Sequence, residues 1–325
     1  MNAEARGIPL TLRARLGESM TGEEPVSFSV GPEGEAVVLL AAEADAPDVL
    51  GRDTSPGWAT FPHSTTPRPI LTSALMHDGR SARRVRLQDG IPAHPHVQPL
   101  PGGEVLVVGA RCWRFKDGTA EHNAFVYRAD GTLRRTATFG DGIADVQSTT
   151  RGEIWVSYFD EGIFGSYGWG GAEGPSPIGG SGLIRFDERG APSWKYTPPE
   201  SFDGIDDCYA LNVADDAVWA YYYASFPLVR IERDDVVTAW RTEISGASAF
   251  ATDGERVLFY GGYADERERC VLGLLKDGAV AEMIACRLIL PSGEPLEAAR
   301  VIGRGPLLHV FAGADWFSAD VRSCA

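Results

Sequence analysis

The feature that most constrains this chain is a hairpin that returns along its whole length. In each copy, two short apolar strands flank a turn rich in Gly or Asp. The clearest copy runs from Asp145 to Phe159, with its turn at Thr150-Arg151-Gly152. The remaining copies are residues 26–42, 94–109, 209–223, 247–263 and 298–312. A repeat of about 40 to 50 residues indicates a propeller or a solenoid.

A second hairpin follows each copy except the last, and most of these hairpins turn at Asp-Gly or Asp-Asp. Asp-Gly between apolar runs is a strong hairpin signal, so the repeat holds four strands, as a propeller blade does. After residues 316–321 the last copy lacks a fourth strand, which residues 8–16 can supply. We therefore predict one all-β domain, residues 1–325, folded as a six-bladed β-propeller whose last blade is completed by the amino-terminal strand.

The charge of the chain limits its partners. The formal net charge is −15 and no Lys/Arg-rich run occurs, which disfavours nucleic acid and anionic membranes. The first residues contain no apolar stretch typical of a signal peptide, so we expect a cytoplasmic protein, and we expect it to be a monomer. The five cysteines are irregularly spaced and form no Cys-x-x-Cys pair, which favours free, partly buried thiols over structural zinc.

Long loops mark one face of the predicted propeller. They follow the second strand in the first three blades, as residues 43–69, 111–123 and 160–182, whereas the later blades have short connections there. Long irregular loops on a rigid scaffold are disproportionately functional. We therefore expect the ligand or partner to bind on this face.

The loops entering the inner strands repeat the motif Asp-Gly-Ile three times, at residues 89–91, 141–143 and 203–205. A structural interpretation is that Asp caps a turn, Gly takes a positive φ and Ile packs between blades. Polar residues follow each copy and are harder to explain structurally: His94 and His96, then Asp145, then Asp206 and Asp207. Asp160, Glu161 and Arg111 approach from the insertions, and Tyr223 comes from the fourth blade.

Two chemistries would use such a set. Carboxylates with His94 and His96 could hold a divalent metal such as Ca²⁺, Mn²⁺ or Zn²⁺, and His94, His96 and Asp145 are the candidates for its ligands. Alternatively, paired carboxylates could perform general acid–base catalysis. The candidate ligand-binding residues are His94, His96, Arg111, Asp145, Asp160, Glu161, Asp207 and Tyr223, while catalytic residues cannot be named.

The third insertion interleaves Phe159, Phe164, Tyr167 and Trp169 with glycines. Such aromatics either form a stacking wall for a ligand or fold back to plug the channel. The chain contains no nucleophile elbow, phosphate loop or His-Glu-x-x-His zinc helix.

A resemblance to known proteins is carried by four segments in the middle of the chain, residues 154–165, 206–213, 218–223 and 226–229. They are similar to uncharacterised bacterial β-propeller-like proteins, met mostly in actinobacteria, over about residues 140 to 230. The resemblance implies the fold and a bacterial, soluble setting, and it implies no catalytic residues. A wider likeness, at the level of the fold alone, is to six-bladed calcium-dependent lactonases, whose ligand pattern has no match here.

The sequence thus predicts a ligand- or partner-binding propeller of unknown specificity. The alternative is a metal-assisted hydrolase or lyase acting on a small polar substrate at the mouth of the central channel.

Overall fold

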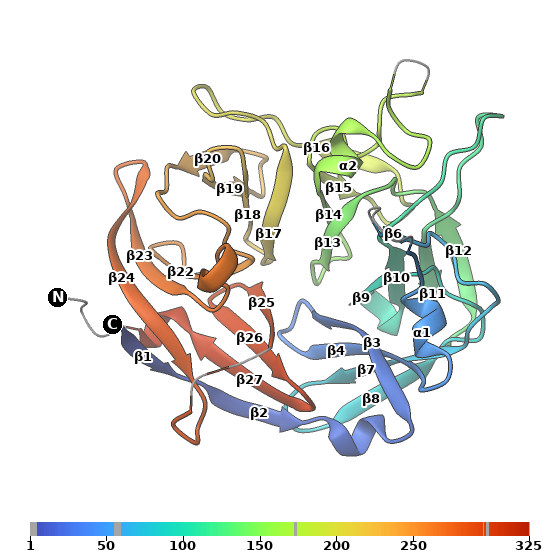
Figure 1. Ribbon diagram of the computed structural model, residues 1–325, viewed down its shortest axis with the longest axis horizontal. Coiled ribbons are helices and arrows are strands. Elements are labelled where there is room, and N and C mark those ends of the chain that lie inside the picture. The colour runs from blue at the N-terminus through green and yellow to red at the C-terminus, as the bar shows by residue number, and fades with distance from the viewer. Residues whose placement is uncertain (1–4, 55–59, 172–173, 295, 297–298, 325) are drawn as a thin grey trace. The chain divides into compact units, whose positions relative to one another are not determined.

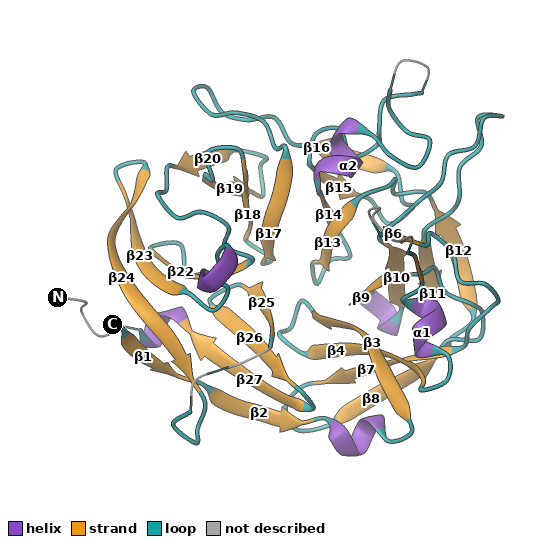
Figure 2. Ribbon diagram, in the orientation of Figure 1, coloured by secondary structure: helices purple, strands orange, loops and turns teal. Residues whose placement is uncertain are grey.

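A computed structural model describes residues 5–54, 60–171, 174–294, 296 and 299–324. Small antiparallel sheets make up almost all of it, and the fold is that of a six-bladed β-propeller (Figures 1 and 2). The chain divides into two compact units, Glu18–Thr197 and the combination of Met1–Gly17 with Pro198–Ala325. Each unit contains three blades. That the chain forms a single domain stays a prediction.

The unit Glu18–Thr197 contains the first three blades, each a meander of four antiparallel strands. The first blade is β3 (Glu23–Val30), β4 (Ala36–Ala42), β7 (Thr72–His77) and β8 (Ala82–Arg86). The second is β9 (Pro95–Pro99), β10 (Val105–Gly109), β11 (Ala124–Tyr127) and β12 (Leu133–Ala137). The third is β13 (Ile143–Ser148), β14 (Ile154–Tyr158), β15 (Leu183–Phe186) and β16 (Pro192–Lys195).

The other unit contains the last three blades. The fourth blade is β17 (Asp207–Val213), β18 (Ala217–Tyr223), β19 (Leu228–Glu232) and β20 (Val237–Trp240). The fifth is β21 (Ala249–Thr252), β22 (Arg256–Tyr260), β23 (Cys270–Lys276) and β24 (Ala279–Ile289). The sixth contributes β25 (Arg300–Arg304), β26 (Leu307–Ala312) and β27 (Asp315–Asp320).

The amino-terminal segment completes this second unit, as the sequence predicts. Strand β2 (Thr11–Arg15) pairs antiparallel with β27 and is the outer strand of the sixth blade (Figure 1). The preceding strand, β1 (Arg6–Pro9), was not predicted as a separate element, and it adds a fifth, parallel strand to the edge of β24. The segment therefore joins two neighbouring blades, because each of its strands pairs with a different one.

Helices are few and short among the described residues. They are α1 (Ala46–Val49), α2 (Asp160–Phe164) and the 3₁₀ turns Gly17–Met20, Pro101–Gly103, Ala264–Glu266 and Val321–Ser323. The first insertion adds a small hairpin of β5 (Arg52–Asp53) and β6 (Phe61–Pro62). None of the described helices has the length and apolar character needed to span a membrane.

Burial follows the apolar runs of the sequence. Every residue of β10 and β14 is buried, whereas the fourth strands β8 and β16 are mostly exposed. A strand buried on both faces needs a continuous apolar run, which is why those central strands do not alternate. All five cysteines are buried and form no disulfide, in agreement with their irregular spacing.

The structural interpretation of the Asp-Gly-Ile motif was only partly right. Its three isoleucines are buried as expected, each exposing less than a twentieth of its surface. A positive φ occurs at Gly142 (68°) but not at Gly90 or Gly204, so the sequence interpretation was wrong for those two. Close packing also requires glycine at position 142, because its backbone meets Gly162 of the third insertion and an added Cβ would lie 2.2 Å from a backbone nitrogen.

Candidate functional site

The three long insertions meet around one pocket of about 650 Å³, wholly within the unit Glu18–Thr197. A cavity of this size suits a small organic ligand. Its lining comes from all three insertions: Asp53, Phe61, Pro62, His63, Ser64, Thr65, Thr66 and Pro67 of the first, Trp113 and Glu121 of the second, and Ser166 and Tyr167 of the third. We call it the insertion pocket.

The first insertion forms one side of the insertion pocket with the β5–β6 hairpin. Asp53 lies opposite Phe61 in this hairpin, and Nε2 of His63 donates a hydrogen bond of 3.0 Å to Oδ1 of Asp53. The backbone of His63 donates to the carbonyl of Gly51. Gly51 is fixed a second time, because Nε2 of His94 donates to the same carbonyl at 2.8 Å. The hairpin is therefore tied to the second blade.

Glu121 joins the first two insertions and holds Trp113. One carboxylate oxygen accepts a hydrogen bond from the hydroxyl of Ser64 (3.1 Å), and the other accepts from the backbone N–H of Trp113 (2.8 Å). The N–H of Glu121 in turn donates to the Trp113 carbonyl. With its backbone held on both sides, Trp113 presents its ring to the pocket, and 45% of that residue stays exposed.

Tyr167 brings the third insertion against the other two. Its hydroxyl donates to the carbonyl of Pro62, and its own carbonyl accepts from the N–H of Arg114 at 2.8 Å. Its ring centre lies 5.1 Å from that of Trp113, at a tilt of 51°. Tyr167 adopts φ 49°, a conformation that is costly for a residue with a side chain and persists only where contacts over-determine it. The aromatic corner of Trp113 and Tyr167 is thus rigidly built.

A buried ion pair lies behind Tyr167. Arg111 is 3% exposed and donates to Asp141 (2.8 Å) and to Glu161 of α2. Its guanidinium carbon lies 4.0 Å from the ring centre of Tyr167 and 5.2 Å from that of Phe159. Arg111 therefore connects the second insertion, the Asp-Gly-Ile motif and the third insertion in one cluster.

Asp141 makes a second contact in the same cluster, because its other carboxylate oxygen accepts a hydrogen bond of 2.9 Å from the backbone N–H of Cys112. That bond holds the backbone directly before Trp113. Burial raises the pKa of the Asp141 carboxyl to about 6, although Arg111 and the amides of Cys112 and Gly142 act to lower it. The carboxyl therefore gains its charge within an ordinary experimental pH range.

The structure brings some of the predicted site residues together and separates others. Arg111 and Glu161 are paired, while Asp160 is exposed at the start of α2 and accepts the N–H of Glu161. His96 and Asp145, on the neighbouring inner strands β9 and β13, approach to 4.0 Å between Nδ1 and Oδ1. His94 bonds to Gly51, and burial lowers its pKa.

Asp207 and Tyr223 belong to the other unit, where they pair across β17 and β18. There Tyr223 is exposed and packs with Tyr209 and Phe226. The metal hypothesis needs a group of ligands, and no cluster of three or more His, Cys, Asp or Glu side chains able to hold an ion exists among the described residues.

None of the eight predicted site residues lines the insertion pocket. Sequence reasoning located the three insertions but missed Asp53, His63, Trp113 and Glu121 within them. For Tyr167 the sequence left two alternatives, part of a stacking wall for a ligand or part of a plug in the channel. The structure places Tyr167 in the wall of the insertion pocket. A signal for the others was present, because both of the first two insertions hold aromatics, a histidine and carboxylates in an irregular sequence.

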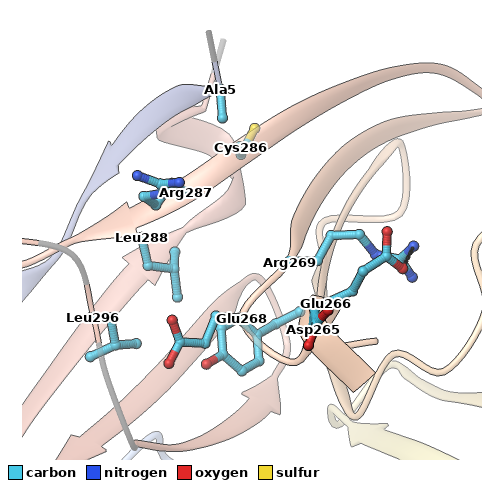
Figure 3. Close-up of a pocket in the computed structure, with 10 residues that line it drawn as sticks. Ala5, Asp265, Glu266, Glu268, Arg269, Cys286, Arg287, Leu288 and Leu296 are labelled. Atoms are coloured by element: carbon cyan, nitrogen blue, oxygen red, sulfur yellow. Dashed lines mark hydrogen bonds and ion pairs between the residues drawn. The ribbon is translucent and has the colours of Figure 1, made fainter. Parts of the chain in front are cut away.

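A smaller cavity of about 420 Å³ lies in the other unit, lined by residues including Tyr260, Glu266, Glu268, Arg269, Cys286 and Arg287 (Figure 3). Arg269 pairs with Glu266 at 2.8 Å and also donates to the Ser245 carbonyl. Tyr260 is buried, so no exposed aromatic surface is offered there by the described residues. The insertion pocket is therefore the better candidate.

Comparisons with known proteins bear mainly on the fold. The model of the YxzG family matches residues 196–316, which is less than half of the chain and includes none of the residues lining the insertion pocket. No curated protein matches the chain. The match fits a family of propellers, while the actinobacterial origin stays a prediction.

Three solved structures illustrate the fold-level likeness. A streptogramin B lyase is 9% identical, with a TM-score of 0.46 and 95% of each chain covered. A virginiamycin B lyase from Staphylococcus aureus is 11% identical, with a TM-score of 0.41 over 95% of this chain and 97% of that one. XC5397 from Xanthomonas campestris, a gluconolactonase, is 11% identical, with a TM-score of 0.41 over 98% and 97%. Likeness at this distance carries no argument about activity.

Proposed function

We propose that this protein binds a small organic molecule in the insertion pocket. The observation that carries the proposal is the convergence of three separate insertions, from three blades, on one cavity of about 650 Å³. Most ligand sites are concave, largely apolar and equipped with a few fixed polar groups, and this cavity has Trp113, Phe61 and Tyr167 beside Asp53 and His63.

The fixed geometry of the three insertions supports a ligand-binding role for them over a purely structural one. Glu121 and Tyr167 hold the insertions together through their side chains, and Trp113, a large apolar residue, stays about half exposed. A preformed site avoids the entropy of ordering loops when the ligand arrives. From the net charge of −15 we also propose that the partner is neither nucleic acid nor an anionic membrane.

The test is a panel of small aromatic and cyclic molecules scored by the melting temperature of the full chain. A compound present at 100 times its dissociation constant stabilises the folded state by about 2.7 kcal/mol. We expect binders that stabilise the native protein and the variant Phe115→Ala, but not Trp113→Ala. Phe115 is the matched control because it is an exposed aromatic of the same insertion outside the lining. Binding that survives Trp113→Ala, or a panel without any binder, would contradict the proposal.

The second candidate function is a metal-assisted hydrolase or lyase. The observation that favours it is the approach of His96 and Asp145 on adjacent inner strands. Purified protein would then carry a stoichiometric divalent metal and lose thermal stability on addition of a chelator. Elemental analysis without such a metal would remove this candidate.

A further inference from the structure

We propose that the ligand of the insertion pocket is an organic cation, an amine attached to an apolar ring. This rests on the proposed binding function and adds the chemical class of the ligand. The juxtaposition that supports it is an accessible carboxylate, Asp53, in the same cavity as the exposed rings of Trp113 and Phe61.

The lining of the insertion pocket is electrostatically one-sided. It contains the carboxylates of Asp53 and Glu121, and none of its described residues is a Lys or an Arg. Arg52 precedes Asp53 in β5, and successive side chains of a strand point to opposite faces, which fits the presence of Asp53 and not Arg52 in the lining. Among the described lining residues, an anionic ligand would meet two carboxylates and neither a Lys nor an Arg.

The two carboxylates differ in what they offer a ligand. Both oxygens of Glu121 already accept hydrogen bonds from Ser64 and Trp113, so Glu121 contributes charge and position. The side chain of Asp53 is 83% exposed and meets His63 through Oδ1. An ammonium group entering the pocket can therefore reach Asp53 directly.

Arg111, a buried cation beside the pocket wall, does not reverse this field. Its guanidinium lies against the ring of Tyr167 and is paired with two carboxylates, Asp141 and Glu161. When both are ionised, the three side chains together carry one negative charge. The Arg111 cluster then adds to the negative potential of the pocket.

The rings supply the apolar part of the recognition. Phe61 is 46% exposed, and Trp113 forms a tilted corner with Tyr167 in which a flat molecule can lie against indole. Trp is the strongest aromatic partner for a cation, and such contacts change affinity by about 2- to 30-fold. A cation with an attached ring would use both the face of Trp113 and the carboxylate of Asp53.

The experiment compares three molecules that share one ring and differ in charge: tryptamine, indole-3-ethanol and indole-3-acetate. Binding to the full chain is measured by titration calorimetry at about pH 7.5, where the amine is charged. We expect tryptamine to bind about tenfold more tightly than the uncharged alcohol, since an accessible charge pair and a cation–π contact are added, and indole-3-acetate to bind least. Of the three affinities, only that for tryptamine should fall as the salt concentration is raised.

Variants then separate charge from shape. Asp53→Asn should abolish the preference for tryptamine over indole-3-ethanol. Glu43→Gln is the control, because Glu43 is an exposed carboxylate of the same insertion outside the lining. A preference that survives Asp53→Asn, equal affinities for the amine and the alcohol, tighter binding of the acetate, or no binding of tryptamine would each overturn the proposal. The binding function itself is judged separately, by the panel and Trp113→Ala.

Discussion

The two units of this protein hold their blades together in the same way but differ in the loops that the blades carry. In Glu18–Thr197, the buried amide of Gln98 on β9 donates to Val30 of the first blade and accepts from the backbone and hydroxyl of Ser148 in the third. In the other unit, the buried amide of Asn212 on β17 donates to Phe250 of the fifth blade and exchanges hydrogen bonds with Gly305 of the sixth. Each unit thus fastens three blades through one side chain of an inner strand.

Only the first of these units carries the long insertions and the insertion pocket. The scaffold and the binding surface are therefore separable: amides and apolar strands hold the blades, and loops of the first three blades add the chemistry. Changes to the scaffold should alter stability, while changes to the insertions should alter binding with little effect on folding.

The largest effect is expected from deleting residues 1–17, which removes β1 and β2 from two blades of the second unit. Ile8, Leu10 and Leu16 are buried, and each contributes about 1.5–3 kcal/mol. Their sum rivals the total stability of a typical domain, about 5–15 kcal/mol. We expect loss of cooperative unfolding, measured by calorimetry. A truncated chain that melts as sharply and as late as the full one would show that the second unit does not depend on this segment.

The next effect concerns the two amides. Gln98→Leu and Asn212→Leu each leave several buried backbone or hydroxyl groups without partners, and we expect each to cost about 3–5 kcal/mol. Urea unfolding measures the cost, with the exposed Gln88→Leu as a control within about 0.5 kcal/mol. A large loss at one position and none at the other would show that the two units are held together differently.

Asp141 should give the first unit a pH dependence of its own. Its folded pKa of about 6 lies above the ordinary value of 3.8 for a carboxyl of this type, so the folded state keeps a proton that the unfolded state has lost. Stability is then highest below pH 4 as far as this group is concerned, and falls by about 3 kcal/mol as the pH rises to 6 and beyond.

The comparison of variants isolates that dependence. Asp141→Asn should flatten the loss of stability between about pH 4 and 6. Asp203→Asn is the matched control, because Asp203 occupies the same motif in the other unit and is exposed. Unfolding free energies measured across this range decide the matter. Identical pH profiles for the native protein and Asp141→Asn would contradict the assignment.

The smallest effect on stability is expected from Trp113→Ala and Tyr263→Ala, two exposed aromatics, one in each unit. Each is about half-buried and packs against an aromatic neighbour, so each should lower the unfolding free energy by about 0.5–1.5 kcal/mol. Of these two variants, only Trp113→Ala should abolish the stabilisation that a bound ligand gives. Equal loss of binding in both variants would show that the insertion pocket alone does not hold the ligand.

The architecture could be predicted from the sequence because it depends on local signals. Asp-Gly turns, apolar runs and the missing fourth strand of the last blade are each readable over a few residues, and they led to β2 on β27. The position of β1 could not be inferred, since it pairs with β24 through partners as distant in the chain as Arg6 and Cys286.

The site was harder because tertiary contacts decide it. His94 was chosen as a ligand, yet its ring is engaged with Gly51 of an insertion whose path no periodicity describes. The three Asp-Gly-Ile copies are identical in sequence, but of their three aspartates, all among the described residues, only Asp141 pairs with a buried arginine. Glu121 acquires its role by folding back onto Trp113. The length of the insertions was enough to predict which surface carries the insertion pocket. The identity of the side chains alone was not enough to predict which residues line it.

The most direct test of the central claim is hydrogen exchange, read by mass spectrometry, with the tightest binder of the panel bound to the full chain. We predict slowed exchange in residues 60–67, 111–121 and 164–169, which contribute to the insertion pocket, and unchanged exchange in residues 198–324. Protection confined to residues 198–324, or protection absent from all three insertions, would contradict the claim that binding resides in the insertions of the first three blades.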